Sequence, residues 1–211
     1  MAEPVIPVSD DSTVAARRQV EGVVVETFAA PGLIALTPPK HGDPRGFLSE
    51  TYSRRRFREI GIDIEFVQDN HTYSAGQGTI RGLHFQVPPH EQGKLVRVLR
   101  GAIVDVVVDI RRGSPAFGRA TAVELSAENW RQLYVPPGFA HGFCTLTPDA
   151  EVLYRMTKYY ATDADRGLAF DDPDLAIRWP VPASAAILSD KDRRHPRLRD
   201  LPAHFSFEVE S

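Results

Sequence analysis

The segment Gly78-Thr79-Ile80-Arg81-Gly82-Leu83-His84-Phe85-Gln86 decides the fold prediction, together with Pro136-Pro137-Gly138-Phe139-Ala140-His141 later in the chain. Both segments carry short apolar runs beside glycine or proline, which is the pattern of strands in an antiparallel barrel. Their histidines stand at spacings that almost match the two ligand motifs of a metal-binding β-barrel. The match fails at Gln86, which takes the place of the second histidine in a His-x-His pair. A barrel pocket with histidines but an incomplete ligand set favours acid–base chemistry by side chains.

The composition fits one large domain in the cytoplasm. The chain has 211 residues, of which 42% are apolar, and this is enough for a single barrel with its own core. A formal net charge of only −3 gives no global basic field to attract nucleic acid or an anionic membrane. The one cysteine, Cys144, cannot form an internal disulfide, and no apolar run is long enough to cross a bilayer. We therefore expect a cytoplasmic protein without a nucleic-acid or membrane partner.

The chain divides into a flexible N-terminal arm over residues 1–22 and a single domain over residues 23–211. The arm is polar and shows little periodicity. From Val23 onward, short β-branched and aromatic runs alternate with glycine, proline, aspartate and asparagine, which predicts an all-β sandwich or barrel. Arg54–Ile60 is expected to form a short helix, and the charged tail from Ser189 to Arg199 has room for another.

Side-chain alternation predicts which residues share a pocket. Residues of equal parity on a strand lie on one face, so Gly82, His84 and Gln86 lie together and Arg81 lies opposite. Arg81 and His84 can enter one pocket only if a bend or bulge lies between them, or if Arg81 serves a neighbouring subunit's site. Gly82 makes such a bend possible.

The histidine spacing allows a metal site of the cupin type. That site requires G-x5-H-x-H-x3,4-E in one segment and P-x-G-x2-H in another. Gly78 and His84 fit the first motif, Glu91 stands at an acceptable distance, and His141 completes the second. The spacing indicates the cupin fold, and a three-ligand site of His84, Glu91 and His141 in a metal-dependent cupin enzyme remains an alternative.

The same histidine can instead act as a general base. Histidine titrates near physiological pH, and a neighbouring carboxylate can fix its tautomer. Tyr154 can return a proton from the opposite wall, and a cation such as Lys94 can stabilise an enolate oxygen.

A further set of motifs resembles one enzyme family over most of the chain, from about Val23 to about Arg199. The matching segments are Asp43-Pro44-Arg45-Gly46-Phe47 with Glu50, Phe66-Val67-Gln68-Asp69-Asn70, Arg81 to Gln86, Gly93-Lys94-Leu95-Val96-Arg97, Asp105 to Asp109 with Gly113-Ser114-Pro115, Ser126-Ala127-Glu128-Asn129, Pro137 to Phe143, Tyr154 with Tyr159-Tyr160, and Leu188-Ser189-Asp190-Lys191-Asp192. Their order and content are similar to those of the dTDP-4-dehydrorhamnose 3,5-epimerase family. The resemblance implies an all-β, cupin-type jelly-roll β-barrel with short peripheral helices.

The resemblance also implies roles for individual residues. His84 corresponds to the general base, Asp192 to its orienting carboxylate, and Tyr154 to the acid on the opposite face. Lys94 corresponds to the cation beside the enolate oxygen. The implied substrate contacts are Arg45 and Arg81 at the diphosphate, Tyr160 on the thymine ring, and Glu50, Gln68, Asn70, His141, Asp165 and Lys191 along the nucleotide or sugar. Asp165 is shorter than the glutamate that the family commonly has there.

The expected activity is epimerisation of dTDP-4-dehydro-6-deoxy-D-glucose at C3 and C5 to dTDP-4-dehydro-L-rhamnose, through an enolate and without a cofactor. The partner implied is this dTDP-4-keto-6-deoxysugar, and the assembly implied is a homodimer. Epimerisation at C3 or C5 alone, on a related sugar, is an alternative within the same family. A cupin that binds a sugar nucleotide without turning it over is a third hypothesis, which the presence of His84, Tyr154, Lys94 and Asp192 together disfavours.

Overall fold

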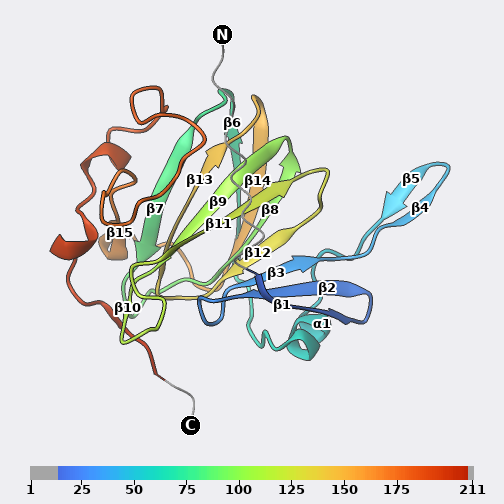
Figure 1. Ribbon diagram of the computed structural model, residues 1–211. Coiled ribbons are helices and arrows are strands. Elements are labelled where there is room, and N and C mark those ends of the chain that lie inside the picture. Colours follow the sequence, from blue (N-terminus) through green and yellow to red (C-terminus); the bar gives the residue numbers. More distant parts are fainter. Residues whose placement is uncertain (1–13, 209–211) are drawn as a thin grey trace.

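Two antiparallel β-sheets face each other in this protein, whose computed structural model describes residues 14–208 (Figure 1). In spatial order, the larger sheet consists of β1 (Val14–Val20), β2 (Val23–Phe28), β3 (Ile34–Thr37), β12 (Gln132–Val135), β8 (Lys94–Arg100), β14 (Ala150–Met156) and β6 (Gln68–Ser74). The smaller sheet consists of β11 (Ala120–Ser126), β9 (Ala102–Asp109), β13 (Phe139–Thr145), β7 (Ile80–Gln86) and β15 (Asp165–Gly167). Two short pairs join β4 (His41–Asp43) with β5 (Gly46–Leu48) and β10 (Arg111–Arg112) with β16 (Phe205–Ser206).

The helices described within residues 14–208 are short and lie at the periphery. They are α1 (Arg54–Ile60) and the 3₁₀ turns η2 (Thr162–Ala164), η3 (Asp192–Arg194) and η4 (Leu198–Asp200). The predicted all-β class with short peripheral helices is confirmed, as is the helix expected at Arg54–Ile60. In the part of the chain that is described, no helix has the length and apolar composition needed to cross a membrane.

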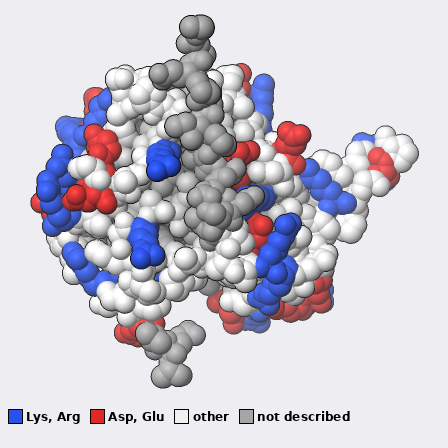
Figure 2. Space-filling model, in the orientation of Figure 1, with Lys and Arg blue, Asp and Glu red and all other residues white. Residues whose placement is uncertain are grey.

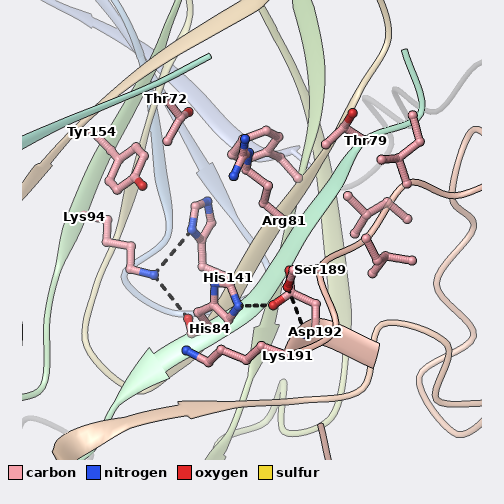
Figure 3. Close-up of a pocket in the computed structure, with 14 residues that line it drawn as sticks. Thr72, Thr79, Arg81, His84, Lys94, His141, Tyr154, Ser189, Lys191 and Asp192 are labelled. Carbon is pink, nitrogen blue, oxygen red and sulfur yellow. Dashed lines mark hydrogen bonds and ion pairs between the residues drawn. The ribbon is translucent and has the colours of Figure 1, made fainter. Parts of the chain in front are cut away.

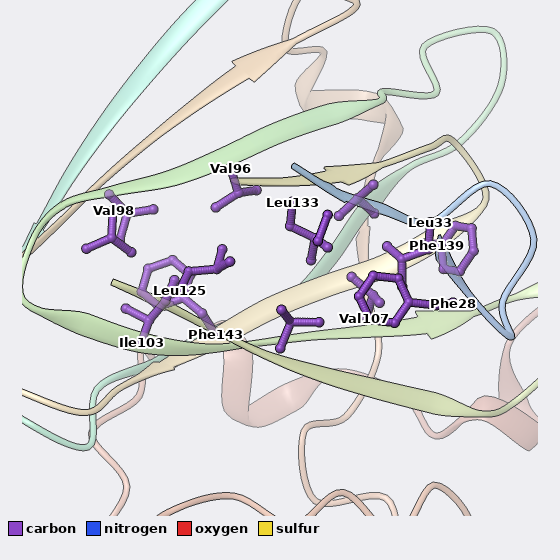
Figure 4. Close-up of a cluster of buried hydrophobic side chains, with 14 of the residues drawn as sticks. Phe28, Leu33, Val96, Val98, Ile103, Val107, Leu125, Leu133, Phe139 and Phe143 are labelled. Atoms are coloured by element: carbon purple, nitrogen blue, oxygen red, sulfur yellow. The ribbon is translucent and has the colours of Figure 1, made fainter. Parts of the chain in front are cut away.

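The main hydrophobic core fills the space between the two sheets (Figure 4). Val96 and Val98 on β8 enter it from the larger sheet, and Ile103 and Val107 on β9 enter it from the smaller one. The position numbers within each pair differ by an even number, because alternate side chains of a strand point to the same face. The core therefore holds the two sheets together.

A second apolar layer covers the outer face of the smaller sheet. Val104, Val106 and Val108 on β9 point away from the main core and pack with Leu168 and Leu201 of the C-terminal segment. Figure 1 shows this segment, in orange and red, lying against β7 and β15. The packing fixes the C-terminal segment beside the end of β7.

Charge is distributed without a large patch of one sign on the face seen in Figure 2, where acidic and basic side chains are interspersed. The formal net charge of the whole chain is −3. This face therefore lacks the continuous basic surface that binding to a nucleic-acid backbone requires.

Part of the expected N-terminal arm is ordered as a strand, which corrects the prediction of a flexible arm over residues 1–22. Val14–Val20 form β1, which pairs antiparallel with β2 through a tight turn at Glu21 and Gly22. Both turn residues have positive φ, 46° and 82°, as hairpin turns that match the twist of the strands require. Backbone pairing at a sheet edge needs little apolar side-chain pattern, so the polar composition did not reveal it. Residues 1–13 of the predicted arm lie outside the described residues.

A bulge in β7 answers the question of how Arg81 and His84 share a pocket. His84 pairs with His141 on β13, whereas Arg81 pairs with Phe143, so β7 contains one residue more than β13 between these pairs. The extra residue reverses the side-chain parity, as expected for a β-bulge. Gly82 lies within the bulge with φ of 132°, a conformation that side chains rarely adopt. Arg81 and His84 consequently line the same pocket.

We predict that Gly82→Ala destabilises the fold by more than about 2 kcal/mol. A Cβ at this position would lie 2.5 Å from Gly142 Cα and 2.9 Å from His141 O, both of which are backbone atoms. Urea unfolding measures the change. Gly42→Ala is the matched control, because its Cβ would meet no atom closer than 3.6 Å, and it should stay within about 0.5 kcal/mol of the parent protein. Equal stability of the two variants would contradict the assigned role of Gly82.

Candidate active site

A pocket of about 450 Å³ opens between the two sheets and the C-terminal segment (Figure 3). Strands β7 and β13 of the smaller sheet, β8 and β14 of the larger sheet, and the residues around η3 supply its walls. The sequence-predicted residues that line it are Arg81, His84, Lys94, His141, Tyr154, Lys191 and Asp192. All four of the expected catalytic side chains are therefore brought together in one cavity.

His84 is held by a carboxylate from the C-terminal segment. Its Nε2 lies 2.8 Å from Asp192 Oδ1, and the other carboxylate oxygen accepts a hydrogen bond from the backbone N–H of Gly82. Burial by itself would raise the pKa of Asp192, but contacts with the imidazoles of His195 and His84 outweigh it and lower the pKa. An ionised Asp192 fixes the orientation of His84 and leaves Nδ1 as the ring nitrogen available for chemistry.

Lys94 forms the centre of a buried polar chain that links the two sheets. Its Nζ donates a hydrogen bond of 3.1 Å to His84 O and lies 3.5 Å from His141 Nδ1, while His141 Nε2 lies 2.9 Å from Asp105 Oδ2. Burial lowers the pKa of Lys94 to about 8, although the negative charge of Asp105 opposes the shift. Burial also lowers the pKa of His141. A neutral His141 can therefore donate from Nε2 to Asp105 and present Nδ1 to the Lys94 ammonium.

Tyr154 occupies a different wall from His84. It lies on β14 of the larger sheet, opposite Asn70 of β6 and Val96 of β8, whereas His84 lies on β7 of the smaller sheet. Burial raises the pKa of Tyr154, and the nearby charge of Arg81 and a hydrogen bond with Asn70 counteract this only in part. Its hydroxyl is thus protonated at neutral pH and can donate a proton into the pocket.

Four of the expected substrate-binding residues form a hydrogen-bonded rim outside the pocket wall. Gln68 donates from Nε2 to Asn70 Oδ1 at 2.8 Å and accepts at Oε1 from the backbone N–H of Tyr160 at 3.1 Å. The Tyr160 hydroxyl donates to Asp165 Oδ2 at 2.9 Å, and the same oxygen pairs with Lys191. Because Lys191 also lines the pocket, the rim continues the cavity outward toward solvent.

Two expected substrate-binding residues lie apart from this pocket. Arg45 belongs to the β4–β5 hairpin, which projects away from the barrel in Figure 1, and its guanidinium pairs with Asp43. Glu50 pairs with Arg56 at 3.3 Å. Neither residue lines the cavity that contains His84.

The ligand set of a cupin-type metal site is not assembled. Glu91 Oε1 pairs with Lys158 Nζ at 2.5 Å, and Glu91 does not line the pocket that holds His84 and His141. Gln86, at the position of the missing histidine, fastens a loop instead. Its Nε2 donates to His90 O at 2.8 Å, and its Oε1 accepts from Ala161 N–H at 2.7 Å. The three residues proposed from spacing alone therefore do not fit a cupin metal centre.

His195 was not predicted from the sequence, and in the structure it contacts both members of the His84–Asp192 pair. Its Nε2 is 3.6 Å from Asp192 Oδ1, and its ring makes an edge-to-face contact with that of His84. The available signal was its position three residues after Asp192, on the same short turn. Ser189 was also missed as a separate contributor; its hydroxyl accepts a hydrogen bond from the backbone N–H of Asp192.

The comparisons with known proteins all point to one family. A family model described as dTDP-4-dehydrorhamnose 3,5-epimerase matches residues 27–200. A dTDP-4-dehydrorhamnose 3,5-epimerase from Sinorhizobium fredii is 49% identical over 172 residues, which are 82% of this chain and 88% of that protein.

Solved structures agree with this match. The crystal structure of dTDP-4-dehydrorhamnose 3,5-epimerase from Bacillus anthracis, with TDP and PPi bound, is 51% identical, with a TM-score of 0.77 over 79% of this chain and 94% of that one. The dTDP-6-deoxy-D-glucose-3,5-epimerase from Legionella pneumophila, in complex with dTDP-4-keto-L-rhamnose, is 40% identical, with a TM-score of 0.84 over 89% of this chain and 100% of that one. These similarities confirm the predicted cupin-type jelly roll.

We predict that the Lys94 ammonium loses its proton with a midpoint near pH 8. Its charge is then present below this pH and lost above it, because burial disfavours the charged form. A ¹³C-NMR titration of labelled lysine side chains measures the midpoint, and Lys94→Met identifies the signal by its absence. Asp105→Asn should lower the midpoint further, since Asp105 opposes the effect of burial. A Lys94 midpoint above pH 10 would show that the ammonium is solvated rather than buried.

Proposed function

The chain belongs to the dTDP-4-dehydrorhamnose 3,5-epimerase family, and we propose that it converts dTDP-4-dehydro-6-deoxy-D-glucose to dTDP-4-dehydro-L-rhamnose by epimerisation at C3 and C5. It is thus an isomerase of deoxysugar biosynthesis. The observation that carries the proposed mechanism is the placement of His84 and Tyr154 on different walls of one pocket, with Lys94 buried beside them. Inversion at carbon requires this arrangement, because one face must lose a proton and the other must gain one.

His84 acts as the base in this proposal. The hydrogens on C3 and C5 are acidic because each carbon is adjacent to the C4 ketone. His84 takes one of them, and the ionised Asp192 at 2.8 Å stabilises the imidazolium that forms. The electron pair left behind moves into the carbonyl and gives an enolate.

Lys94 stabilises the negative charge that develops on the C4 oxygen. A buried ammonium is effective here because the surroundings are already organised and little solvent screens the charge. Its contacts with His84 O and His141 Nδ1 hold Nζ in position before substrate arrives.

Tyr154 returns a proton from the opposite wall, which completes the inversion. The enolate reforms the ketone, the carbon gains the phenolic proton, and Tyr154 is left as a phenolate. The proton on His84 and the missing proton on Tyr154 then equilibrate with water before the next carbon reacts. No electron transfer occurs, so the chemistry needs only these proton transfers.

Binding of the dTDP moiety is assigned to the pocket mouth. Arg81, with its Nε bonded to Ser74 Oγ at 3.1 Å and its Nη2 to Tyr73 O at 3.0 Å, presents a fixed guanidinium for the diphosphate. Tyr160, at the exposed end of the rim, provides a ring for the thymine. Cys144 is a buried free thiol, in keeping with the reducing cytoplasm that we propose as the compartment.

A homodimer would bring Arg45, one of the two expected residues that lie outside the cavity, to a pocket. The β4–β5 hairpin projects from the barrel, and Phe47 and Leu48 on its strand β5 are 53% and 75% exposed. Exposed apolar side chains on a projecting element favour burial against another subunit. We therefore assign Arg45 to the diphosphate site of the partner rather than to that of its own chain.

Epimerisation at one carbon alone is the second candidate, because the same base, acid and cation serve either position. Which carbon meets His84 depends on how the sugar is positioned. Incubation of dTDP-4-dehydro-6-deoxy-D-glucose with the protein in D₂O separates these cases. Deuterium at C3 and C5 supports the proposed activity, and deuterium at a single carbon supports the alternative.

We predict different defects in His84→Ala and Tyr154→Phe. His84→Ala should lower both deuterium incorporation and product formation by about 10²–10⁴-fold, because the base is absent. Tyr154→Phe should lower product formation by at least about 10²-fold but keep exchange, because His84 can return a deuteron to the face it deprotonated. NMR of the substrate in D₂O measures both rates.

The matched controls are Tyr73→Phe and His71→Ala. The Tyr73 hydroxyl bonds to Asp149 and His71 pairs with Glu151, both away from the pocket. Both variants should keep near-parental rates. Full product formation by Tyr154→Phe would remove that residue from its assigned role.

We predict that Arg45 acts across the dimer. Chains with Arg45→Ala and chains with His84→Ala should each be impaired, and their co-expression should restore activity, because a mixed dimer contains one complete site. Arg81→Ala combined with His84→Ala should show no such rescue, since both residues line one cavity of one chain. Sedimentation should give the mass of two chains. A monomer, or equal behaviour of the two pairs, would contradict this arrangement.

A further inference from the structure

Three potential metal ligands lie in the wall between two hollows. His84 and Asp192 line the proposed active site, whereas His195 lines a second hollow of about 580 Å³. Each residue offers a ligand atom, and the three atoms lie within 4.8 Å of one another. Within residues 14–208 this is the cluster of histidine and carboxylate groups with spacing suited to a cation. A cation has an approach from either hollow.

The Nε2 atom of His195 has no hydrogen-bond partner among the described residues, although it is buried. It lies 3.6 Å from Asp192 Oδ1, which is too long for a hydrogen bond. A buried, unsatisfied nitrogen is costly, and His195, although its imidazole favours the ionised form of Asp192, takes part in no proton-transfer step of the proposed epimerisation.

The His195 ring is fixed in this place by its packing. A Cβ on Gly167 would lie 2.3 Å from atoms of the ring, so the backbone of β15 lies directly against it. On the other side, the ring contacts His84 edge to face, with centroids 5.4 Å apart. The orphaned nitrogen is thus held facing Asp192 and the His84 ring.

We propose that His84, Asp192 and His195 form a binding site for a transition-metal cation such as Zn²⁺, and that its occupation blocks the active site. In a tetrahedral zinc site, bonds of about 2.0–2.2 Å place neighbouring ligand atoms about 3.3 Å apart. Asp192 Oδ1 lies 2.8 Å from one Nε2 and 3.6 Å from the other, on either side of this value. Three protein ligands leave the fourth position to water.

The ligand chemistry selects the kind of cation. Two imidazole nitrogens and one carboxylate oxygen favour Zn²⁺, Co²⁺, Ni²⁺ or Cu²⁺ over Mg²⁺ and Ca²⁺, which prefer all-oxygen sites. Two basic side chains next to these ligands in the sequence engage other groups: Lys191 pairs with Asp165, and Arg194 donates to Asp190 O. These positive charges nevertheless weaken binding, so a reversible site is expected rather than a permanently occupied one.

Occupation of the site removes the base from catalysis. The cation takes the place of the proton between His84 Nε2 and Asp192, and that proton is released to water. The carboxylate then binds the metal and no longer stabilises an imidazolium. This inhibitory consequence rests on the proposed function, whereas binding of the metal does not.

Cobalt provides a test that is independent of turnover. Tag-free protein treated with a chelator is titrated with CoCl₂, and the visible absorption of four- or five-coordinate Co²⁺ is recorded. We expect absorption that Zn²⁺ displaces and that MgCl₂ does not. His195→Ala and the closer mimic His195→Gln should each weaken Co²⁺ binding at least about tenfold. His204→Ala is the matched control, because His204 lines the same hollow outside the cluster and should bind as the parent protein does.

Inhibition by ZnCl₂ is measured in parallel by the D₂O exchange assay. Zn²⁺ should inhibit the parent protein and His204→Ala, EDTA should reverse this, and His195→Ala should need at least about tenfold more Zn²⁺. Absence of cobalt absorption, or equal Co²⁺ affinity with and without His195, would overturn the site. Binding that depends on His195 but does not slow exchange would uphold the metal site and overturn its proposed inhibitory effect.

Discussion

The contact between His84 and Asp192 is the constraint on which the rest of the site depends. It joins a strand in the middle of the chain to a turn 108 residues later. The second apolar layer makes this possible, because the C-terminal segment packs on the outer face of the smaller sheet and carries η3 to the end of β7. Asp192 also accepts the Gly82 N–H within the bulge, so one carboxylate fixes both the base and the irregular strand. The site is therefore complete only when the C-terminal segment is packed in place.

Patterns within short stretches of the sequence predicted those features of the structure that depend on short stretches. Alternating apolar residues and turn residues predicted the all-β class, and motif spacing predicted one barrel site for His84 and His141. In the structure these two residues pair directly on neighbouring strands. The N-terminal strand β1 was not predicted, because it forms through backbone pairing with β2 and its side chains are mostly polar. The sequence left the bulge in β7 as one of two possibilities, because strand register depends on residues far apart in sequence. His195 carried no motif, and only tertiary packing brings its nitrogen near Asp192.

The buried chain from Asp105 through His141 to Lys94 addresses a conflict between stability and function. Removing a lysine ammonium from water is costly, and the lowered pKa of Lys94 records that cost. Asp105, itself fully buried and in contact with His141, reduces it by its negative charge and does not line the pocket. Because the chain crosses from one sheet to the other, the charge is fixed in place before a negative oxygen forms. This organisation is what makes the charge useful to an enolate.

Proton transfer and metal binding use different nitrogens of the His84 imidazole: Nδ1 is left free to take the substrate proton, whereas Nε2 faces Asp192 and is the proposed metal ligand. The chain lacks the His-x-His pair of a cupin centre, and Gln86 fastens a loop in its place. His84 nevertheless has the neighbours that a metal ligand needs. Asp192 Oδ1 lies 2.8 Å from its Nε2, and the Nε2 of His195 lies 3.6 Å from the same oxygen. Whether a cation binds is then decided by His195. His84 and Asp192 alone offer a cation two ligands, and His195 supplies the third. The metal affinity proposed for this protein thus depends on His195, a residue that transfers no proton in the proposed reaction.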